Sequence, residues 1–127
     1  NMSAKLTGEI SSKIIFKLST DKSEADETDT RAFCETLKLY ESDILYAEAF
    51  LHYIVIHTKD NEYKIKEPIS VFENKVSDDF YRIHRSYLVS LKYITRISRT
   101  SVTIGNSTLP LSRGKYDDIN RAFIEHN

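Results

Sequence analysis

Short runs of β-branched, aromatic and other apolar residues follow one another along this chain of 127 residues. Polar turn residues separate most of these runs from the next, which is typical of strands. The runs that we expect to form strands are 13–19, 33–40, 44–49, 53–58, 63–66, 81–91, 102–104 and 109–111. Their number and length predict one β-dominated domain with seven to ten short strands and two short helices.

The alternation between Tyr81 and Leu91 contains one residue that a buried strand face does not accept. Apolar side chains at the odd positions would line a single face, and Arg85 falls on that same face. Burial of an unpaired guanidinium is very unfavourable. We therefore expect the chain to turn or bulge around His84, Arg85 and Ser86, so that Arg85 points outward.

Turn residues predict a β-hairpin near the C-terminus. Gly105 and Asn106 form a natural two-residue loop between two apolar runs. Pro110 has no N–H to donate to a neighbouring strand, so its strand is expected at a sheet edge.

Two short helices are predicted from apolar spacing and from helix-start residues. Pro68 suits a first helical turn, and the apolar residues Ile69, Phe72 and Val76 follow at intervals of three and four. Ser112 is a candidate N-cap for the second helix. The apolar members of that helix are Tyr116, Ile119 and Phe123.

Positive charge is concentrated in one part of the chain. Residues 80–115 contain seven Lys and Arg residues and no Asp or Glu, which gives this segment a net charge of +7. Because the whole chain carries −1, the other 91 residues carry −8. Such a distribution is typical of a protein that meets a polyanion with one face.

Composition excludes several classes of protein. Cys34 is the single cysteine, which excludes an internal disulfide and favours a reducing compartment, the cytoplasm. The longest uncharged apolar run, 49–58, is shorter than the roughly 20 residues of a membrane helix, and we expect no signal peptide. We expect residues 1–12 to be a tail or linker remnant, 13–127 to be the domain and 20–30 to be an acidic loop within it.

Neither enzymatic chemistry nor a bound metal is expected. The chain shows no pairing of nucleophile and base, no glycine-rich phosphate loop among its three glycines, and no cluster of His and carboxylate ligands. We therefore predict no catalytic residue, no cofactor and no metal site.

Three segments resemble, in order and spacing, the LytTR family of bacterial DNA-binding domains. They are 43–49 (DILYAEA), 80–89 (FYRIHRSYLV) and 109–113 (LPLSR). The resemblance implies a mainly β fold of about ten short, mostly antiparallel strands in small sheets, with one or two short helices. It also implies sequence-specific binding of double-stranded DNA by loops in the major groove, as the output domain of a transcriptional response regulator in a two-component system.

The same resemblance implies partners beyond this chain. Family members usually follow a receiver domain, so we expect an upstream receiver or sensor that is missing from this sequence. They commonly bind paired direct repeats in promoters as dimers, so a homodimer on DNA is a further expectation.

By resemblance, the base-reading positions are Arg85, Arg113 and one residue of the loop that ends near His52 and Tyr53. Within that loop, His52 and Tyr53 are equal candidates. A guanidinium can donate two parallel hydrogen bonds to guanine O6 and N7, which discriminates between bases by about 1–3 kcal/mol. The residues expected to contact DNA phosphates are Arg82, His84, Ser86, Lys92, Arg99 and Lys115, with Arg96 as a further candidate.

Some of these residues have an alternative role. His84 could instead hold its loop through a hydrogen bond to the backbone, and Lys92 or Arg96 could pair with an acid of the domain body. The alternative function is a small β module that binds RNA or a protein partner through some of its eight tyrosines and six phenylalanines. These aromatic residues fall mostly on apolar registers, which indicates a core rather than a stacking platform.

Overall fold

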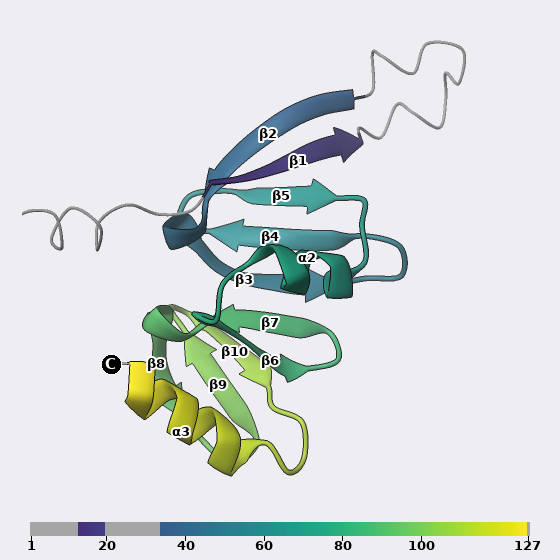
Figure 1. Ribbon diagram of the computed structural model, residues 1–127. Coiled ribbons are helices and arrows are strands. Elements are labelled where there is room, and N and C mark those ends of the chain that lie inside the picture. The colour runs from purple at the N-terminus through teal and green to yellow at the C-terminus, as the bar shows by residue number, and fades with distance from the viewer. Residues whose placement is uncertain (1–12, 20–33, 127) are drawn as a thin grey trace, which may run out of the picture.

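The computed structural model describes residues 13–19 and 34–126, in which ten strands form three antiparallel sheets (Figure 1). The predicted mainly β fold, with its short antiparallel strands and two short helices, is confirmed. The tail 1–12, the acidic segment 20–30 and Phe33 lie outside the described residues. No helix among the described residues is long and apolar enough to span a membrane.

The central sheet has five strands in the order β5-β4-β3-β7-β6. They are β3 (Ile44–Ala49), β4 (Ile54–Thr58), β5 (Glu62–Ile65), β6 (Phe80–His84) and β7 (Tyr87–Ser90). Helix α2 (Ile69–Lys75) joins β5 to β6 and crosses one face of the sheet (Figure 1). Pro68 stands at its N-cap, one residue before the first turn.

A second sheet of three strands, in the order β10-β9-β8, follows a short 3-10 turn, η4 (Leu91–Tyr93). Its strands are β8 (Ile94–Ile97), β9 (Ser101–Ile104) and β10 (Ser107–Pro110). Gly105 has φ +60° in the β9–β10 turn, as predicted for this hairpin. Pro110 lies on the edge strand β10, which is also as predicted.

The third sheet pairs β1 (Lys13–Ser19) with β2 (Cys34–Tyr40), and η3 (Glu41–Asp43) leads from it to β3. β1 lies beside β5 without pairing with it, and its side chains Ile14 and Phe16 are buried against the central sheet. The C-terminal helix α3 (Tyr116–His126) packs against η4, β6 and β8.

Two separate hydrophobic cores cover the two faces of the central sheet. Core 1 lies under α2 and contains Ile14, Phe16, Leu39, Ile44, Ala47, Ile54, Ile56, Ile65, Ile69, Phe72, Phe80 and Leu88. Core 2 lies between the central sheet, the three-stranded sheet and α3, and contains Tyr46, Ile83, Val89, Leu91, Ile94, Val102, Ile104, Leu109, Leu111 and Ile119. Successive residues of β3 and β7 therefore point into different cores.

The sequence pattern accounts for one of these faces and misses the other. Odd positions such as Ile83 and Val89 do line one buried face, but the even positions Phe80 and Leu88 are equally buried on the opposite face. The predicted interruption is confirmed, because residues 85–86 form a turn between β6 and β7 and Arg85 is exposed.

The predicted N-cap at Ser112 is wrong. Helix α3 begins at Tyr116, four residues later. The backbone N–H of Ser112 donates to the carbonyl of Ile83 (2.8 Å), and the carbonyl of Ser112 accepts from the N–H of Lys115 (3.2 Å). Strand β6 thus holds Ser112 in the loop before the helix. Asp117 and Asp118 do lie in the first helical turn, where the helix dipole favours negative charge.

Core 1 should depend strongly on Phe72, whose ring is fully buried between Phe16 (centroids 5.8 Å apart) and Phe80 (6.3 Å). We expect Phe72→Ala to lower the free energy of unfolding by about 3–5 kcal/mol, because surrounding side chains relax only partly into the cavity that a deleted ring leaves. Val71→Ala in the same helix is the matched control, since Val71 is 41% exposed and its loss should change stability by less than about 0.5 kcal/mol. Urea unfolding measures both variants, and similar losses from the two would contradict the packing described for α2.

Candidate nucleic-acid interface

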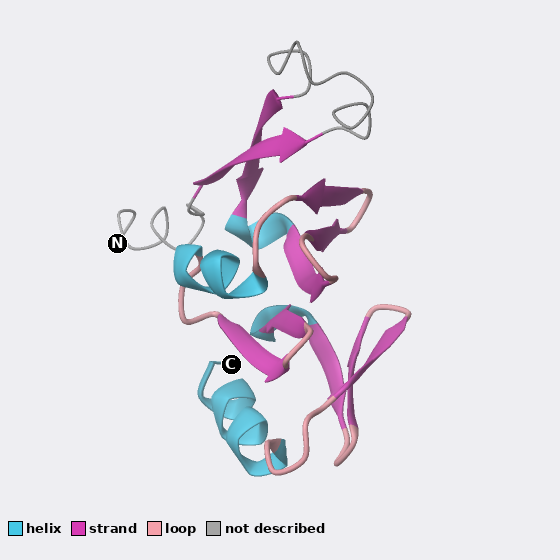
Figure 2. Cartoon of the chain, turned by 90° about the vertical axis from the view of Figure 1, so that its right-hand side faces the viewer, coloured by secondary structure: helices cyan, strands magenta, loops and turns pink. Residues whose placement is uncertain are grey.

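Three connections leave the strands on the same side of the molecule. They are the β3–β4 loop (residues 50–53), the β6–β7 turn (85–86) and the β10–α3 loop (111–115). All three lie at the right of Figure 1 and face the viewer in Figure 2. We call these residues the loop face.

Backbone hydrogen bonds fasten the three connections to one another. The N–H of Ala49, at the start of the β3–β4 loop, donates to the carbonyl of Ser86 (2.7 Å). The N–H of Ser112 donates to the carbonyl of Ile83, beside the β6–β7 turn (2.8 Å). The β6–β7 turn is thus bonded on both sides, so the three connections keep fixed relative positions.

Arg85 and Arg113 are both exposed on the loop face. Neither guanidinium forms an ion pair or a hydrogen bond with another described residue. Arg113 precedes Gly114, whose φ of +85° lets the chain turn toward α3. All donors of both arginines are therefore available to a ligand.

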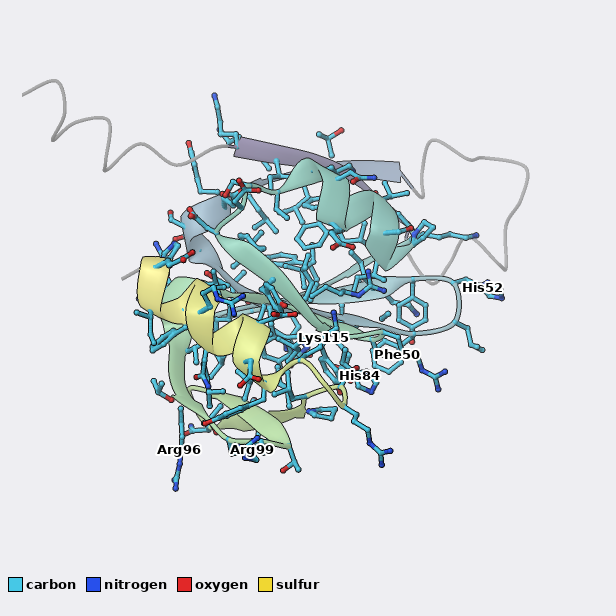
Figure 3. The ribbon with its side chains drawn as sticks, turned by 60° about the horizontal axis from the view of Figure 1, so that its bottom comes forward. Phe50, His52, His84, Arg96, Arg99 and Lys115 are labelled. Atoms are coloured by element: carbon cyan, nitrogen blue, oxygen red, sulfur yellow. The ribbon has the colours of Figure 1, made fainter. Side chains whose placement is uncertain are left out.

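The β3–β4 loop distinguishes the two residues that the sequence left as equal candidates. Tyr53 is half-buried, its ring is stacked on Phe50 (5.2 Å between centroids), and the ammonium of Lys64 lies 4.4 Å from the ring centre. His52 is exposed at the end of the loop and points away from the body (Figure 3). Leu51 is 94% exposed beside it, a residue that no sequence signal singled out.

His84 makes the backbone hydrogen bond that was the alternative to a phosphate contact. Its Nδ1 accepts from the N–H of Ser86 (3.0 Å), so the ring proton belongs on Nε2. This hydrogen bond joins the last residue of β6 to the second residue of the β6–β7 turn and so stabilises the turn. The Nε2–H remains as a donor on a half-buried ring.

Arg82 is engaged with protein groups. Its Nη1 donates to Glu73 Oε1 (2.7 Å), its Nε to the carbonyl of His84 (3.0 Å) and its Nη2 to the carbonyl of Arg85 (2.7 Å). Three of its five N–H donors are thus committed.

The remaining predicted phosphate contacts divide by position. Lys115 lies in the β10–α3 loop, with its ammonium 5.8 Å from the ring centre of Tyr81. Arg99 borders the loop face, because its guanidinium stacks over Tyr116 (4.6 Å) at the start of α3. Arg99, Arg113 and Gly114 line a hollow of about 450 Å³.

Lys92 and Arg96 lie elsewhere. Lys92 belongs to η4, which follows β7 at the end opposite the β6–β7 turn (Figure 1). Arg96 is exposed on β8, apart from His52 in Figure 3. Lys92 and Arg96 therefore lie outside the three connections of the loop face, and their contact with DNA stays a prediction.

A polar cluster lies behind the loop face, on the side of core 2. The hydroxyl of Tyr87 donates to Glu48 Oε2 (2.9 Å). His57 lies 3.4 Å from Glu48 and 3.4 Å from Glu62, and its ring stacks on Tyr46 (4.2 Å). Burial, together with the hydrogen bond and charge of Glu48, raises the pKa of Tyr87 to about 12. No group of three or more His, Cys, Asp or Glu residues in the described part of the chain is arranged to hold a metal ion.

Comparison with known proteins gives the following matches. Residues 35–124 match the family model described as the LytTr DNA-binding domain. A segment of 56 residues is 38% identical to the sensory transduction protein LytT of Bacillus subtilis, and the match spans 43% of this chain and 23% of that protein. The fold is similar to a solved LytTr DNA-binding domain from Bacillus cereus, with a TM-score of 0.62, 22% identity, and coverage of 87% of this chain and 95% of that one.

Stability at high pH should report the Tyr87–Glu48 bond. Between pH 10, the ordinary pKa of tyrosine, and about 12, the unfolded chain loses the Tyr87 proton while the folded chain keeps it. The unfolded state then binds fewer protons, so the free energy of unfolding falls as pH rises through this window. Tyr87→Phe removes this contribution, and we expect its stability to fall less steeply than that of the unchanged protein in urea unfolding across the window. Tyr40→Phe, at an exposed phenol, is the control, and identical slopes for Tyr87→Phe and the unchanged protein would contradict the assignment.

Proposed function

The chain belongs to the LytTr DNA-binding domain family, and from this premise we propose that it binds double-stranded DNA sequence-specifically through the loop face. The observation that carries the proposal is the exposure of two arginines without acidic partners on connections that are bonded to each other. We further propose that it acts in the bacterial cytoplasm as the output domain of a transcriptional response regulator.

Arg85 and Arg113 are proposed as the main base-reading residues. The major groove is about 12 Å wide and exposes O6 and N7 of guanine, to which a guanidinium can donate two parallel hydrogen bonds. Because the two arginines project from separate connections, we propose that each reads a different base pair. A groove entered by loops requires no helix-turn-helix reader, which suits a domain built of short strands.

The β3–β4 loop is proposed to supply a third contact. His52 is the exposed side chain at its end, whereas the Tyr53 ring stacks on Phe50 and lies under the ammonium of Lys64. Leu51 offers an apolar surface beside His52, and the methyl group of thymine is the base feature that such a surface recognises. We therefore propose His52 as the polar reader of this loop, with Tyr53 as its support.

Phosphate contacts are proposed for cations and donors at the rim of the loop face. Lys115 and Arg99 flank Arg113, and the hollow between Arg99 and Gly114 has space for a phosphate group. The hydroxyl of Ser86 and the Nε2–H of His84 are further donors beside Arg85. Such contacts orient a protein on DNA and carry no base preference.

The upstream signal is proposed to come from a receiver or sensor domain. The matched relative is named a sensory transduction protein, and this chain covers less than a quarter of its length. Paired direct repeats and a homodimer on DNA are part of the same proposal. The alternative, an RNA or protein-binding β module, is less well supported, because cores cover both faces of the central sheet and leave no open aromatic platform.

Substitution of the two arginines should separate base reading from phosphate contact. A preferred duplex is first selected from a random pool, and affinities are then measured by fluorescence anisotropy. We expect Arg85→Ala and Arg113→Ala each to remove about 1–3 kcal/mol of discrimination at one base pair, at different positions for the two variants. Lys115→Ala should weaken binding to all duplexes alike and lower the log–log salt slope by about 0.9.

Lys38→Ala is the control for loss of a surface cation, since Lys38 is exposed on β2 in the separate two-stranded sheet. Equal losses on selected and scrambled duplexes from both arginine variants would contradict their assignment as readers.

A salt titration should distinguish the proposed function from its alternative. We expect a steep salt dependence and nanomolar affinity for the selected duplex, because several phosphates are neutralised together. Single-stranded RNA of matched length should bind more weakly at every salt concentration. Tighter binding to the RNA would favour the alternative module.

A further inference from the structure

Arg82 lies on β6 three residues before Arg85 of the β6–β7 turn, and its guanidinium is directed at the turn itself. It donates to the carbonyl of His84, at the end of β6, and to the carbonyl of Arg85, in the turn. The pairing of β6 with β7 shifts between Arg82 and His84, and His84 is then paired with Tyr87 at the end of the ladder.

The four consecutive carbonyls of residues 83–86 all accept hydrogen bonds. Ser112 donates to Ile83, Arg82 donates to both His84 and Arg85, and Ala49 donates to Ser86. The outer two bonds link the turn to its neighbouring connections. The inner two fix the backbone from which the Arg85 side chain projects, and one side chain supplies both.

Glu73 holds Arg82 in the orientation that this requires. Its carboxylate accepts from Nη1 at 2.7 Å, and the side chains of Arg82 and Glu73 are 26% and 41% exposed. Glu73 follows Phe72, which is fully buried in core 1, so its place on α2 is set by that core. A continuous path of contacts therefore leads from core 1 through Glu73 and Arg82 to the turn.

We propose that Glu73 and Arg82 are positioning residues for base reading by Arg85, an inference that rests on the proposed function. The ion pair aims the guanidinium, and the guanidinium fixes the turn from which Arg85 reaches its base. Neither residue needs to contact DNA. This replaces the sequence-based expectation that Arg82 contacts a phosphate.

The geometry requires arginine at position 82. A guanidinium presents its donors in a planar fork and can reach three acceptors at once, whereas the ammonium of lysine is a compact point charge. Arg82→Lys therefore keeps the charge and loses the fork. A phosphate contact would survive this change in large part, but a positioning role would not.

Glu73 gives a test in which the two explanations differ in sign. If charge alone matters, Glu73→Gln removes repulsion near DNA and tightens binding to every duplex. If Glu73 positions Arg82, the same change weakens the selected duplex and leaves a scrambled duplex unaffected or slightly tighter. Asp78→Asn is the matched control, because it removes one carboxylate from an exposed residue shortly after α2.

The experiment measures the affinity of each variant for the selected duplex, for duplexes altered at each base pair, and for a scrambled duplex. We expect Glu73→Gln and Arg82→Lys to lower discrimination by roughly 3- to 10-fold at the base pair assigned to Arg85, as coupled residues in contact do. Discrimination at the Arg113 base pair should be unchanged, and the salt slope should stay as in the unchanged protein. In an Arg85→Ala background, Glu73→Gln should have no further effect on discrimination.

Amide hydrogen exchange gives a second readout that needs no DNA. We expect the N–H groups of Ala49 and Ser86 to exchange about tenfold faster in Arg82→Lys, because the turn that bonds them has lost its inner support. The thermal midpoint shows whether each variant is folded. If the unchanged protein discriminates between no duplexes, the proposed function fails, while faster exchange would still show that Arg82 orders the β6–β7 turn.

Three results would overturn the inference. The first is tighter binding of Glu73→Gln to selected and scrambled duplexes alike. The second is full base discrimination in Arg82→Lys combined with a salt slope lowered by about 0.9 in Arg82→Gln, which would assign Arg82 to a phosphate. The third is unchanged amide exchange at Ala49 and Ser86 in Arg82→Lys.

Discussion

Packing on both faces of the five-stranded sheet determines where this domain can meet a ligand. Core 1 occupies one face together with α2 and the β1–β2 hairpin, and core 2 occupies the other with the three-stranded sheet and α3. With both faces buried, the polar backbone that is free for recognition lies at the ends of the strands. The loop face is one such end, and it is where Arg85 and Arg113 emerge.

The loop face differs from a set of independent surface loops because its backbone is bonded across connections. Ordering flexible loops at the moment of binding would subtract from affinity. Here the bonds from Ala49 to Ser86 and from Ser112 to Ile83 form within the protein itself, and Arg82 with His84 satisfies the turn between them. In the proposed function, the positive charge of residues 80–115 then attracts DNA to a face whose backbone is already ordered.

Much of this arrangement could be predicted from local patterns. The misfit of Arg85 with its apolar strand face predicted the turn, Gly105 and Pro110 predicted the hairpin and its edge strand, and the motifs predicted the fold. Local patterns could not reveal which residues meet across elements. The partner of Arg82 is on α2, and only packing brings Glu73 to it. Ser112 has the chemistry of a helix cap, but a bond to β6 keeps it in a loop. Buried residues at both odd and even positions of β6 and β7 follow from two cores, which a search for one apolar face does not detect.

The hydrogen bonds between the connections use main-chain atoms, and every residue except proline carries both the N–H and C=O groups that form them. The side chains at positions 52, 85 and 113 take no part in these hydrogen bonds. Under the proposed function, target preference and architecture are therefore separable in this domain. Substitutions at these three sites would change which duplex is preferred, while the hydrogen-bonded backbone that presents the side chains would stay the same.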